Sequence, residues 1–247
     1  MVGAAVRGRL SWQLASVAEI VRETERVHTI VLDVPEWSEH RAGQHLDIRL
    51  TAEDGYRAER EYSIASAPGE PAAITVERLE DGEVSSYLVG EIRVGDAFEV
   101  RGPLGGYFVW GPEDGGPLLL LAGGSGVVPL RSILRHRDRS GSDVPIRLLY
   151  SSRSLDEVIY RTELDEAIDG VEVVYTLTRA QPPGWDGYAR RVDAALLREV
   201  AWPPEESPHT FVCGPTSFVE TVARELVDLG YQPERVKTER FGATGGT

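Results

Sequence analysis

The sequence predicts a two-domain protein, an N-terminal antiparallel β-barrel followed by a C-terminal α/β domain built on a doubly wound parallel sheet. Three observations lead to this fold class. Residues 13–110 hold short strand-like runs separated by turn dipeptides, whereas from residue 117 buried apolar runs alternate with helical stretches. The two patterns meet at residues 111–116, a segment of Gly, Pro and acidic residues. We therefore place the domains at residues 1–112 and 117–247.

The N-terminal half consists of short runs in which polar and apolar residues alternate. Dipeptides that favour turns, such as Asp54–Gly55 and Pro68–Gly69, separate these runs. Five or six strands at this spacing predict a small antiparallel barrel or sandwich. We expect strands at 17–21, 27–32, 44–50, 73–79 and 97–101, a further strand within 60–66, and a short helix beginning within 83–88.

In the C-terminal half, repetition of strand and helix predicts a parallel sheet with helical crossovers. The leucine run at 118–121 has the pattern of a strand buried on both faces. After a glycine-rich turn, Pro129 stands where a helix is expected to begin, since its fixed φ suits a first helical turn. Strands are expected at 118–122, 146–150, 171–176 and 210–213, and helices at 130–137, 157–167, 192–200 and 217–229.

Composition excludes several classes of function. The net charge of −14 argues against binding to nucleic acid or to anionic lipid. The single cysteine, Cys213, cannot hold an iron–sulfur cluster or a structural zinc site alone, and we expect no metal on this chain. No apolar run approaches the roughly 18 residues of a membrane span. Because the opening residues also lack the apolar core of a secretory signal, we expect a cytoplasmic protein.

The turn between the first buried strand and the helix of the C-terminal half is a candidate phosphate site. Gly123, Gly124, Ser125 and Gly126 precede the helix, so backbone N–H groups are expected at a helix N-terminus, where an anion is stabilised. Pro129 replaces the third glycine of the usual dinucleotide fingerprint. The alternative is an ordinary glycine turn of an α/β fold that binds no nucleotide.

Two stretches of the N-terminal half are also candidates. Arg60 and Tyr62 project from the same face of a strand, where an arginine can bind a phosphate and a tyrosine can stack on a flat ring. The alternative is a half-buried strand with a surface arginine. After Gly82, the hydroxyl and N–H groups of Ser85 and Ser86 are placed to hold phosphate at a helix start, or a serine acts there as an N-cap.

Taken together and in order, these motifs resemble the ferredoxin–NADP reductase superfamily, in particular its flavodoxin- and oxygenase-reductase branch without a fused ferredoxin. The resemblance extends from about Trp12 to Gly242. It depends on the order of five weak motifs, which are RxYS at 60–63, GxxS at 82–85, GGSGVVP at 123–129, CGP at 213–215 and ERFG at 239–242.

The resemblance implies a flavin between the two domains. Arg60 would bind the flavin diphosphate, Tyr62 would stack on the isoalloxazine ring, and Ser63 would hydrogen-bond near N5, the hydride acceptor. FAD is expected because most of the family uses it, with FMN as the alternative. The remaining positions implied for the flavin are Glu77 and Arg78 on the ribityl or ribose side, and Gly82, Ser85 and Ser86 at the pyrophosphate.

The resemblance also implies a nicotinamide cofactor on the second domain. Gly124, Ser125 and Gly126 would approach its pyrophosphate, and Cys213, followed by Gly214 and Pro215, would lie near the nicotinamide C4. Glu239 would help to place the nicotinamide and Phe241 would cover the flavin face. Ser63, Cys213 and Glu239 are thus the expected catalytic residues. For Cys213, the alternative is a buried apolar strand residue.

Basic residues after the second and third predicted strands favour NADPH over NADH. An acidic residue usually takes the ribose 2′-hydroxyl of NAD at such a strand end, whereas arginine suits a 2′-phosphate. Arg153 and the pair Thr178–Arg179 end these strands, and Arg191 follows a glycine-containing loop. The alternative is scattered surface arginines in an arginine-rich chain.

The implied function is transfer of a hydride from the nicotinamide to the bound flavin, and then of electrons to a separate protein. That acceptor would be a ferredoxin, a flavodoxin, or a component of an oxygenase or P450 system. Two alternatives remain. One is a reductase that releases reduced flavin or reduces small acceptors, and the other is a non-catalytic subunit that retains the fold.

Overall fold

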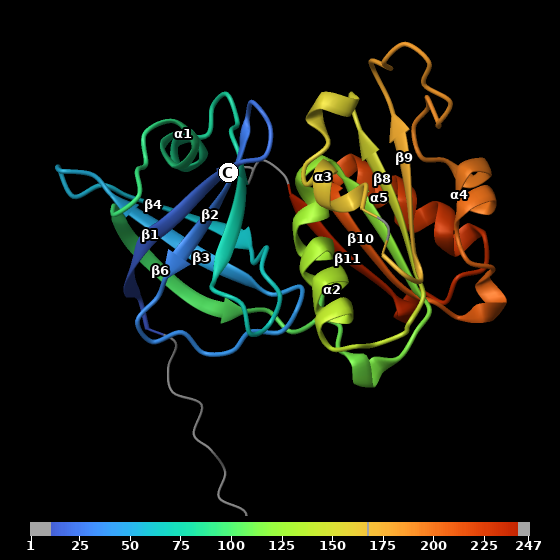
Figure 1. Cartoon of the computed structure of the whole chain (residues 1–247), viewed down its shortest axis with the longest axis horizontal. Helices are drawn as coiled ribbons and strands as arrows, with labels where there is room; N and C mark the ends of the chain where they lie inside the picture. The colour runs from blue at the N-terminus through green and yellow to red at the C-terminus, as the bar shows by residue number, and fades with distance from the viewer. Residues whose placement is uncertain (1–10, 167, 242–247) are drawn as a thin grey trace, which may run out of the picture.

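The computed structural model of the protein describes residues 11–166 and 168–241. Two sheets lie side by side, a six-stranded antiparallel sheet and a five-stranded parallel sheet, as Figure 1 shows. The fold class predicted from the sequence is therefore confirmed. Among the helices of the described residues, none is both long and apolar enough to cross a membrane.

The antiparallel sheet curls into a barrel whose two edge strands are β4 and β5. The strand order is β4-β3-β6-β1-β2-β5, and an isolated bridge between Ile64 and Ile74 joins the two edges. The helix α1 packs against both edge strands. The elements are β1 (Gln13–Arg22), β2 (Val27–Asp33), β3 (His45–Thr51), β4 (Arg57–Ser63), β5 (Ala73–Glu77), α1 (Glu83–Gly90) and β6 (Ala97–Leu104).

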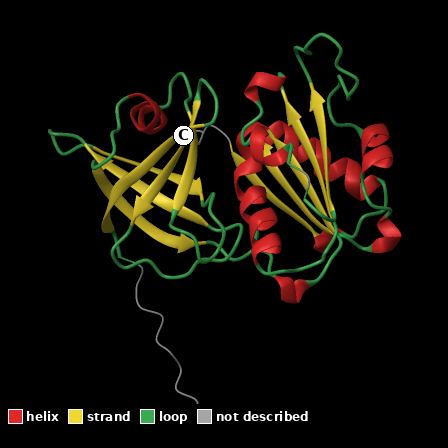
Figure 2. Ribbon diagram, viewed as in Figure 1, coloured by secondary structure: helices red, strands yellow, loops and turns green. Residues whose placement is uncertain are grey.

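The parallel sheet has the order β11-β10-β7-β8-β9, with helices on both faces (Figure 2). Along β7, Leu118 and Leu120 pack on the side of α2, while Leu119 and Leu121 pack on the side of α4 and α5. This two-sided burial explains the uninterrupted leucine run. The elements are β7 (Leu118–Gly123), α2 (Val127–Arg139), β8 (Ile146–Ser152), α3 (Arg161–Leu164), β9 (Val171–Leu177), α4 (Ala194–Val200), β10 (His209–Pro215), α5 (Thr216–Asp228) and β11 (Val236–Phe241).

The interface between the two sheets is a continuous apolar core. Val27, Ala42, Ala65 and Ala73 of the barrel belong to the same buried cluster as the α2 side of the parallel sheet. This is possible because β2 and β5 have two covered faces. Ile30 and Ile74 point into the barrel, and the alternate residues point towards α2.

Three local predictions differ from the structure. The helix expected at 157–167 is a single turn, α3, because Tyr160 adopts a left-handed conformation with φ of 61° and separates it from the 3-10 turn Leu155–Glu157; Ala167 lies outside the described residues. The helix α2 begins at Val127, so Pro129 is its third residue and still lies in the first turn, where a missing N–H costs no hydrogen bond. The edge strand β11 was not expected.

Candidate functional site

The three predicted catalytic residues lie at strand ends between the two domains. Ser63 ends β4, and Cys213 and Glu239 pair directly in the parallel strands β10 and β11. Within the described residues, Ser63 Oγ and Glu239 Oε2 are buried and have no hydrogen-bond partner. Buried polar atoms are nearly always hydrogen-bonded, so two unpaired ones point to a ligand at this corner.

The corner also shifts the acidity of its side chains. Burial, reinforced by the nearby carboxylate of Glu61, raises the pKa of Glu239 to about 7. Burial, reinforced by Glu239, raises the pKa of the Cys213 thiol. At neutral pH the carboxyl group of Glu239 can therefore hold or release a proton, whereas the thiol of Cys213 stays protonated and is a poor nucleophile.

The edge strand β4 forms a track that leads to this corner. At its start, Tyr56 donates a hydrogen bond to Glu83 at the beginning of α1, with 3.3 Å between the oxygens. Arg60 follows, exposed at the surface, and then Tyr62, whose burial raises its pKa to about 12. From the start of β4 to Ser63 the track is about 20 Å long. It can thus seat an extended ligand with its polar end at α1 and its flat ring at Tyr62.

The turn before α1 offers backbone donors rather than free hydroxyls. Gly82 is the N-cap, so the interpretation of Ser85 or Ser86 as an N-cap is wrong. Ser85 Oγ accepts the N–H of Leu79 at 3.2 Å and Ser86 Oγ donates to the carbonyl of Leu79 at 3.3 Å. An anion at this turn would therefore meet the N–H groups at the start of α1.

In the glycine turn, the glycines have different roles. A Cβ on Gly126 would lie 2.1 Å from the carbonyl oxygen of Cys213, so this glycine is needed for close packing between the glycine turn and β10. Gly124 has a φ of +54° and faces open space. Gly214, with a φ of +153°, packs against the carbonyl of Gly123. The turn thus packs closely against β10 and leaves Gly124 and Ser125 half-buried, while Pro215 ends β10.

The predicted 2′-phosphate residues lie together at the carboxyl ends of β8 and β9. The N–H of Arg179 donates to the carbonyl of Arg153 at 2.9 Å, and the N–H of Thr178 donates to Ser152 at 2.9 Å. Arg191 follows a segment bridged in parallel to β9 through Thr176 and Tyr188. The three arginines are exposed.

The arginines at this edge differ in whether they form ion pairs. Arg153 pairs with Glu157 at 3.7 Å, and the neighbouring Arg190 pairs with Glu199 at 2.8 Å. Across residues 11–166 and 168–241, Arg179 and Arg191 form no ion pair. These two guanidinium groups are available to a phosphate.

Three other predicted residues lie at the margins of the site. Glu77 ends β5, and since Val76 points into the barrel, Glu77 points towards the parallel-sheet domain. Arg78 lies beyond the strand, and its N–H donates to the carbonyl of Arg26 at 2.8 Å. Phe241 ends β11 beside Pro215 and packs against the apolar core of the interface. Gly242 of the ERFG motif lies outside the described residues.

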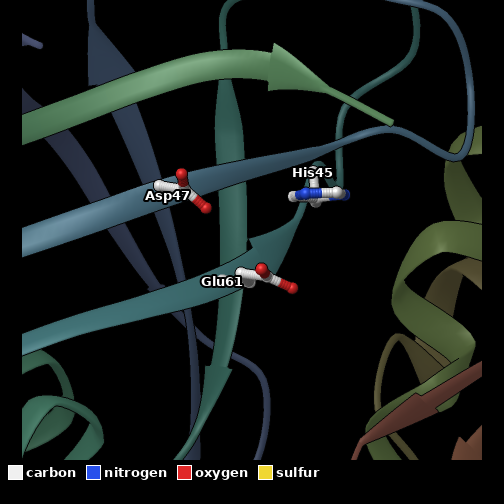
Figure 3. A group of neighbouring side chains, drawn as sticks. All are labelled: His45, Asp47 and Glu61. Atoms are coloured by element: carbon white, nitrogen blue, oxygen red, sulfur yellow. The ribbon is translucent and has the colours of Figure 1, made fainter. Parts of the chain in front are cut away.

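The structure adds a polar cluster next to the corner, which the sequence analysis missed. His45, Asp47 and Glu61 lie on one face of the β3–β4 pair, with nitrogen and carboxylate oxygen atoms within 4.8 Å of one another (Figure 3). Arg101 donates from Nε to Asp47 at 2.9 Å, so that carboxylate is already neutralised. We interpret the group as a polar surface, in which the Glu61 carboxylate forms no ion pair with residues 11–166 or 168–241 and lies close to Glu239. The one signal in the sequence was the register of two alternating strands.

Comparison with known proteins agrees with this geometry. Residues 13–109 match the family model of the oxidoreductase FAD-binding domain, and residues 120–224 match that of the oxidoreductase NAD-binding domain. In structure, the chain resembles the flavohem-like FAD/NAD-binding domain of nitric oxide dioxygenase from Vibrio cholerae, with a TM-score of 0.83, 26% identity and coverage of 93% and 98% of the two chains. Fold and site together define a two-domain oxidoreductase of the flavin- and nicotinamide-binding class.

Sequence similarity to known proteins identifies the family within this class of oxidoreductases. Ferredoxin–NADP reductase B of Sorangium cellulosum is 36% identical over 210 residues, which cover 81% of this chain and 84% of that protein. The chain belongs to the ferredoxin–NADP reductase family, as its motifs indicated. The glycine betaine monooxygenase reductase subunit of Chromohalobacter salexigens is 31% identical over 236 residues, 92% of this chain, but the chain spans only 63% of that relative's length.

The residues present fit the flavin that this family binds. Ser63 Oγ is a buried polar atom that lacks a partner, Tyr62 offers a half-buried ring next to it, and the track along β4 ends at the N–H groups of α1. Between the edge strands β4 and β5 the described residues form only the isolated bridge of Ile64 and Ile74, so most of the β4 edge is not paired with β5. These are the features that an extended, flat, anionic cofactor requires.

Proposed function

We propose that the protein is an NAD(P)H-dependent flavoprotein reductase that passes electrons to a separate protein acceptor. The observation that carries the proposal is that two of the four buried side-chain atoms without a hydrogen-bond partner in the described residues, Ser63 Oγ and Glu239 Oε2, belong to the corner between the two domains. FAD, when bound, accepts a hydride from a nicotinamide and gives up electrons one at a time, and this supplies the redox chemistry.

The residues of the barrel bind and orient in this proposal. Arg60 and the backbone of the Gly82 turn hold the diphosphate, with FMN as the smaller alternative to FAD. Tyr62 supplies a flat apolar surface that excludes water, and the Ser63 hydroxyl supplies a hydrogen bond at the reacting edge of the ring. Glu77 and Arg78 would contact the ribityl or ribose part of the cofactor.

Residues of the parallel-sheet domain bind the nicotinamide and move a proton. Gly124 and Ser125 present N–H groups to the pyrophosphate, and Glu239 holds or releases a proton at Oε2 near neutral pH. Cys213 acts as an apolar wall, since its thiol is buried and protonated. The Cys213–Gly214–Pro215 segment and Phe241 shape the space around the ring.

We also propose that NADPH is preferred over NADH, because the unpaired Arg179 and Arg191 lie close to Thr178 and Arg153 where a 2′-phosphate is expected. A protein acceptor is inferred from two relatives, named as a ferredoxin–NADP reductase and as a reductase subunit of a monooxygenase. With one cysteine, these 247 residues cannot themselves ligate an iron–sulfur cluster. Ferredoxin, flavodoxin, oxygenase and P450 components are the candidate classes.

An anaerobic titration of the purified protein, reconstituted with FAD and separately with FMN, tests this function. We expect NADPH to bleach the flavin absorbance faster than NADH, and the flavin to stay bound during gel filtration. Bleaching by NADH alone would contradict the proposed role of Arg179 and Arg191 in binding a 2′-phosphate. The protein would still be a flavin-dependent reductase. Release of reduced flavin would instead favour a reductase of diffusible flavin, and a protein that binds neither flavin would contradict the function.

A further inference from the structure

Tyr160 connects the two domains through a buried hydroxyl group. It directly precedes α3, is 3% exposed and adopts a left-handed conformation with φ of 61°. Such a conformation is unfavourable for a bulky aromatic residue and persists only where the surroundings impose it. Its hydroxyl donates to Thr75 Oγ1 on β5, the edge strand of the barrel.

This hydrogen bond is the first of a directed series. Thr29 donates to Glu23 Oε1 at 2.6 Å, and the Thr29 and Thr75 hydroxyls lie 2.8 Å apart. Because each hydroxyl has one proton, Thr75 must donate to Thr29, and the order is Tyr160 to Thr75 to Thr29 to Glu23. The series ends on a carboxylate, which strengthens it, and both threonines are at least 94% buried.

The ring of Tyr160 is fixed as firmly as its hydroxyl. The guanidinium carbon of Arg131 lies 4.2 Å from the ring centroid. From the same side chain, Nε donates to Glu163 at 2.8 Å and Nη1 donates to the carbonyl of Ala65, in the barrel, at 3.2 Å. Arg131 belongs to the second turn of α2, the helix that follows the glycine turn.

These contacts bring together the parts of the molecule that bind the two cofactors in the proposed function. The glycine turn contacts β5, and Glu77 is two residues beyond Thr75 on that strand. Tyr160 itself points at neither candidate site, because its hydroxyl and its ring are both used in the interface. A strained residue with a fully engaged side chain is suited to setting a geometry.

We propose that Tyr160 is a positioning residue, whose bond to Thr75 fixes the nicotinamide-binding turn relative to the flavin-binding edge of the barrel and so sets the rate of hydride transfer. The inference rests on the proposed function. Transfer between two bound groups is steeply sensitive to their placement, and small misplacements from a distant substitution lower such rates.

The experiment compares Tyr160→Phe, Thr75→Val and the double variant with Tyr175→Phe as a matched control. Tyr175 donates to Asp165 at 2.9 Å within the parallel-sheet domain, so its loss removes a tyrosine hydrogen bond without touching the interface. Tyr160→Phe leaves no buried donor unpaired, since Thr75 still donates to Thr29. Melting of the protein without cofactors is measured first, followed by cofactor affinities and single-turnover flavin reduction at saturating NAD(P)H.

We expect Tyr160→Phe to lower Tm by about 3 °C, with no further loss in the double variant beyond that of Thr75→Val. Affinities for flavin and nucleotide should stay within about twofold of wild type, while hydride transfer falls at least about tenfold. Tyr175→Phe should transfer hydride at the wild-type rate.

Two outcomes would overturn this proposal without contradicting the proposed function as a reductase. Additive losses of Tm would mean that the bond between Tyr160 and Thr75 does not form. If the Tm losses of Tyr160→Phe and Thr75→Val are not additive but Tyr160→Phe transfers hydride at the wild-type rate, Tyr160 has a structural role only. Wild-type protein that binds both cofactors and transfers no hydride would overturn the proposed function, and this role with it.

Discussion

The corner at Ser63 and Glu239 and the arginine edge at Arg179 and Arg191 are built in opposite ways. At the corner, Ser63 Oγ and Glu239 Oε2 are buried and have no hydrogen-bond partner among the described residues. At the edge, Arg179 and Arg191 are exposed and form no ion pair with that same part of the chain. A buried polar atom gives a strong interaction that is sensitive to geometry, whereas an exposed charge gives a moderate one that water screens. We infer that the corner determines the rate and the edge determines the choice of nucleotide.

The largest expected effect is on the corner. Ser63→Ala should lower the rate constant of flavin reduction by about 100-fold, because it removes a preorganised hydrogen bond at the reacting edge. Stability should change little, since Ser63 Oγ has no partner to lose among the described residues. Anaerobic stopped-flow absorbance at saturating nucleotide measures the rate.

Ser66→Ala is the matched control for Ser63→Ala. Ser66 Oγ accepts the N–H of Ala73 at 3.2 Å, so this variant should lose about 1 kcal/mol of stability and keep the rate. If Ser63→Ala reduced its flavin at the wild-type rate, the corner would have no special role in transfer.

At the arginine edge, Arg179→Ala combined with Arg191→Ala should weaken NADPH by about 10- to 100-fold, since each charged hydrogen bond to a phosphate contributes about 1.5 kcal/mol or more. Affinity for NADH should remain within about twofold. Equilibrium titration of each nucleotide measures both. Arg198→Ala, an exposed arginine on α4, serves as the control, and equal losses for the two nucleotides would contradict a 2′-phosphate role.

Two glycines with similar backbone conformations test whether the glycine turn binds the nucleotide. Gly124 and Gly141 have φ of +54° and +67°, and a Cβ on either would meet open space. Alanine at each position should therefore cost about 1 kcal/mol of stability from backbone strain. Only Gly124→Ala should also weaken NAD(P)H, by about tenfold, because its N–H lies in the nucleotide turn. Similar nucleotide affinities of the two variants would mean that the glycine turn does not bind the nucleotide.

The smallest expected effect is a shift in pH dependence. The raised pKa of Glu239 means that its contribution to stability is present below about pH 4.5 and is lost as pH rises through about 7. Glu61→Gln removes a negative charge near Glu239 and should lower that pKa, so the variant should lose less Tm than wild type between pH 5 and 8.

Because histidines also change the stability of the protein with pH, the effect of Glu239 must be measured as a difference between each variant and wild type. Burial lowers the pKa of four histidines, which therefore add stability as pH rises through about 6.5 and act against Glu239; they are His28, His40, His136 and His209. Glu59→Gln is the control, since that carboxylate lies on the same strand but pairs with Arg49 at 3.6 Å. An equal change of Tm with pH in the two variants would mean that Glu61 does not act on Glu239.

The sequence was sufficient for the architecture and for the motifs, because both depend on local pattern. Leucine runs, glycine turns and strand–helix alternation are short-range signals, and the structure confirms the fold class that they predict. The edge strand β11 escaped prediction because VKTERF is half-exposed and lacks an apolar run. The helix at 157–167 failed because the left-handed Tyr160 is imposed by contacts with another domain.

The same distinction holds for the site. Ser63, Cys213 and Glu239 were predicted from motifs. Their burial, and the lack of hydrogen-bond partners for Ser63 and Glu239 within the described residues, depend on how the two domains meet. Glu61, Tyr160 and Arg131 were missed because their roles come from neighbours 60 or more residues away, as with Arg131 and Ala65. Such pairings leave no trace in spacing or composition.

The apolar cluster that includes Val27, Ala65 and Ala73 of the barrel together with the leucines of β7 has a consequence for folding. Neither domain completes its core alone, because each would expose its part of this cluster to water. We therefore expect the two units that the family models separate to stabilise each other through this shared cluster. In this protein, the boundary between the two recognisable domains runs through a shared apolar core.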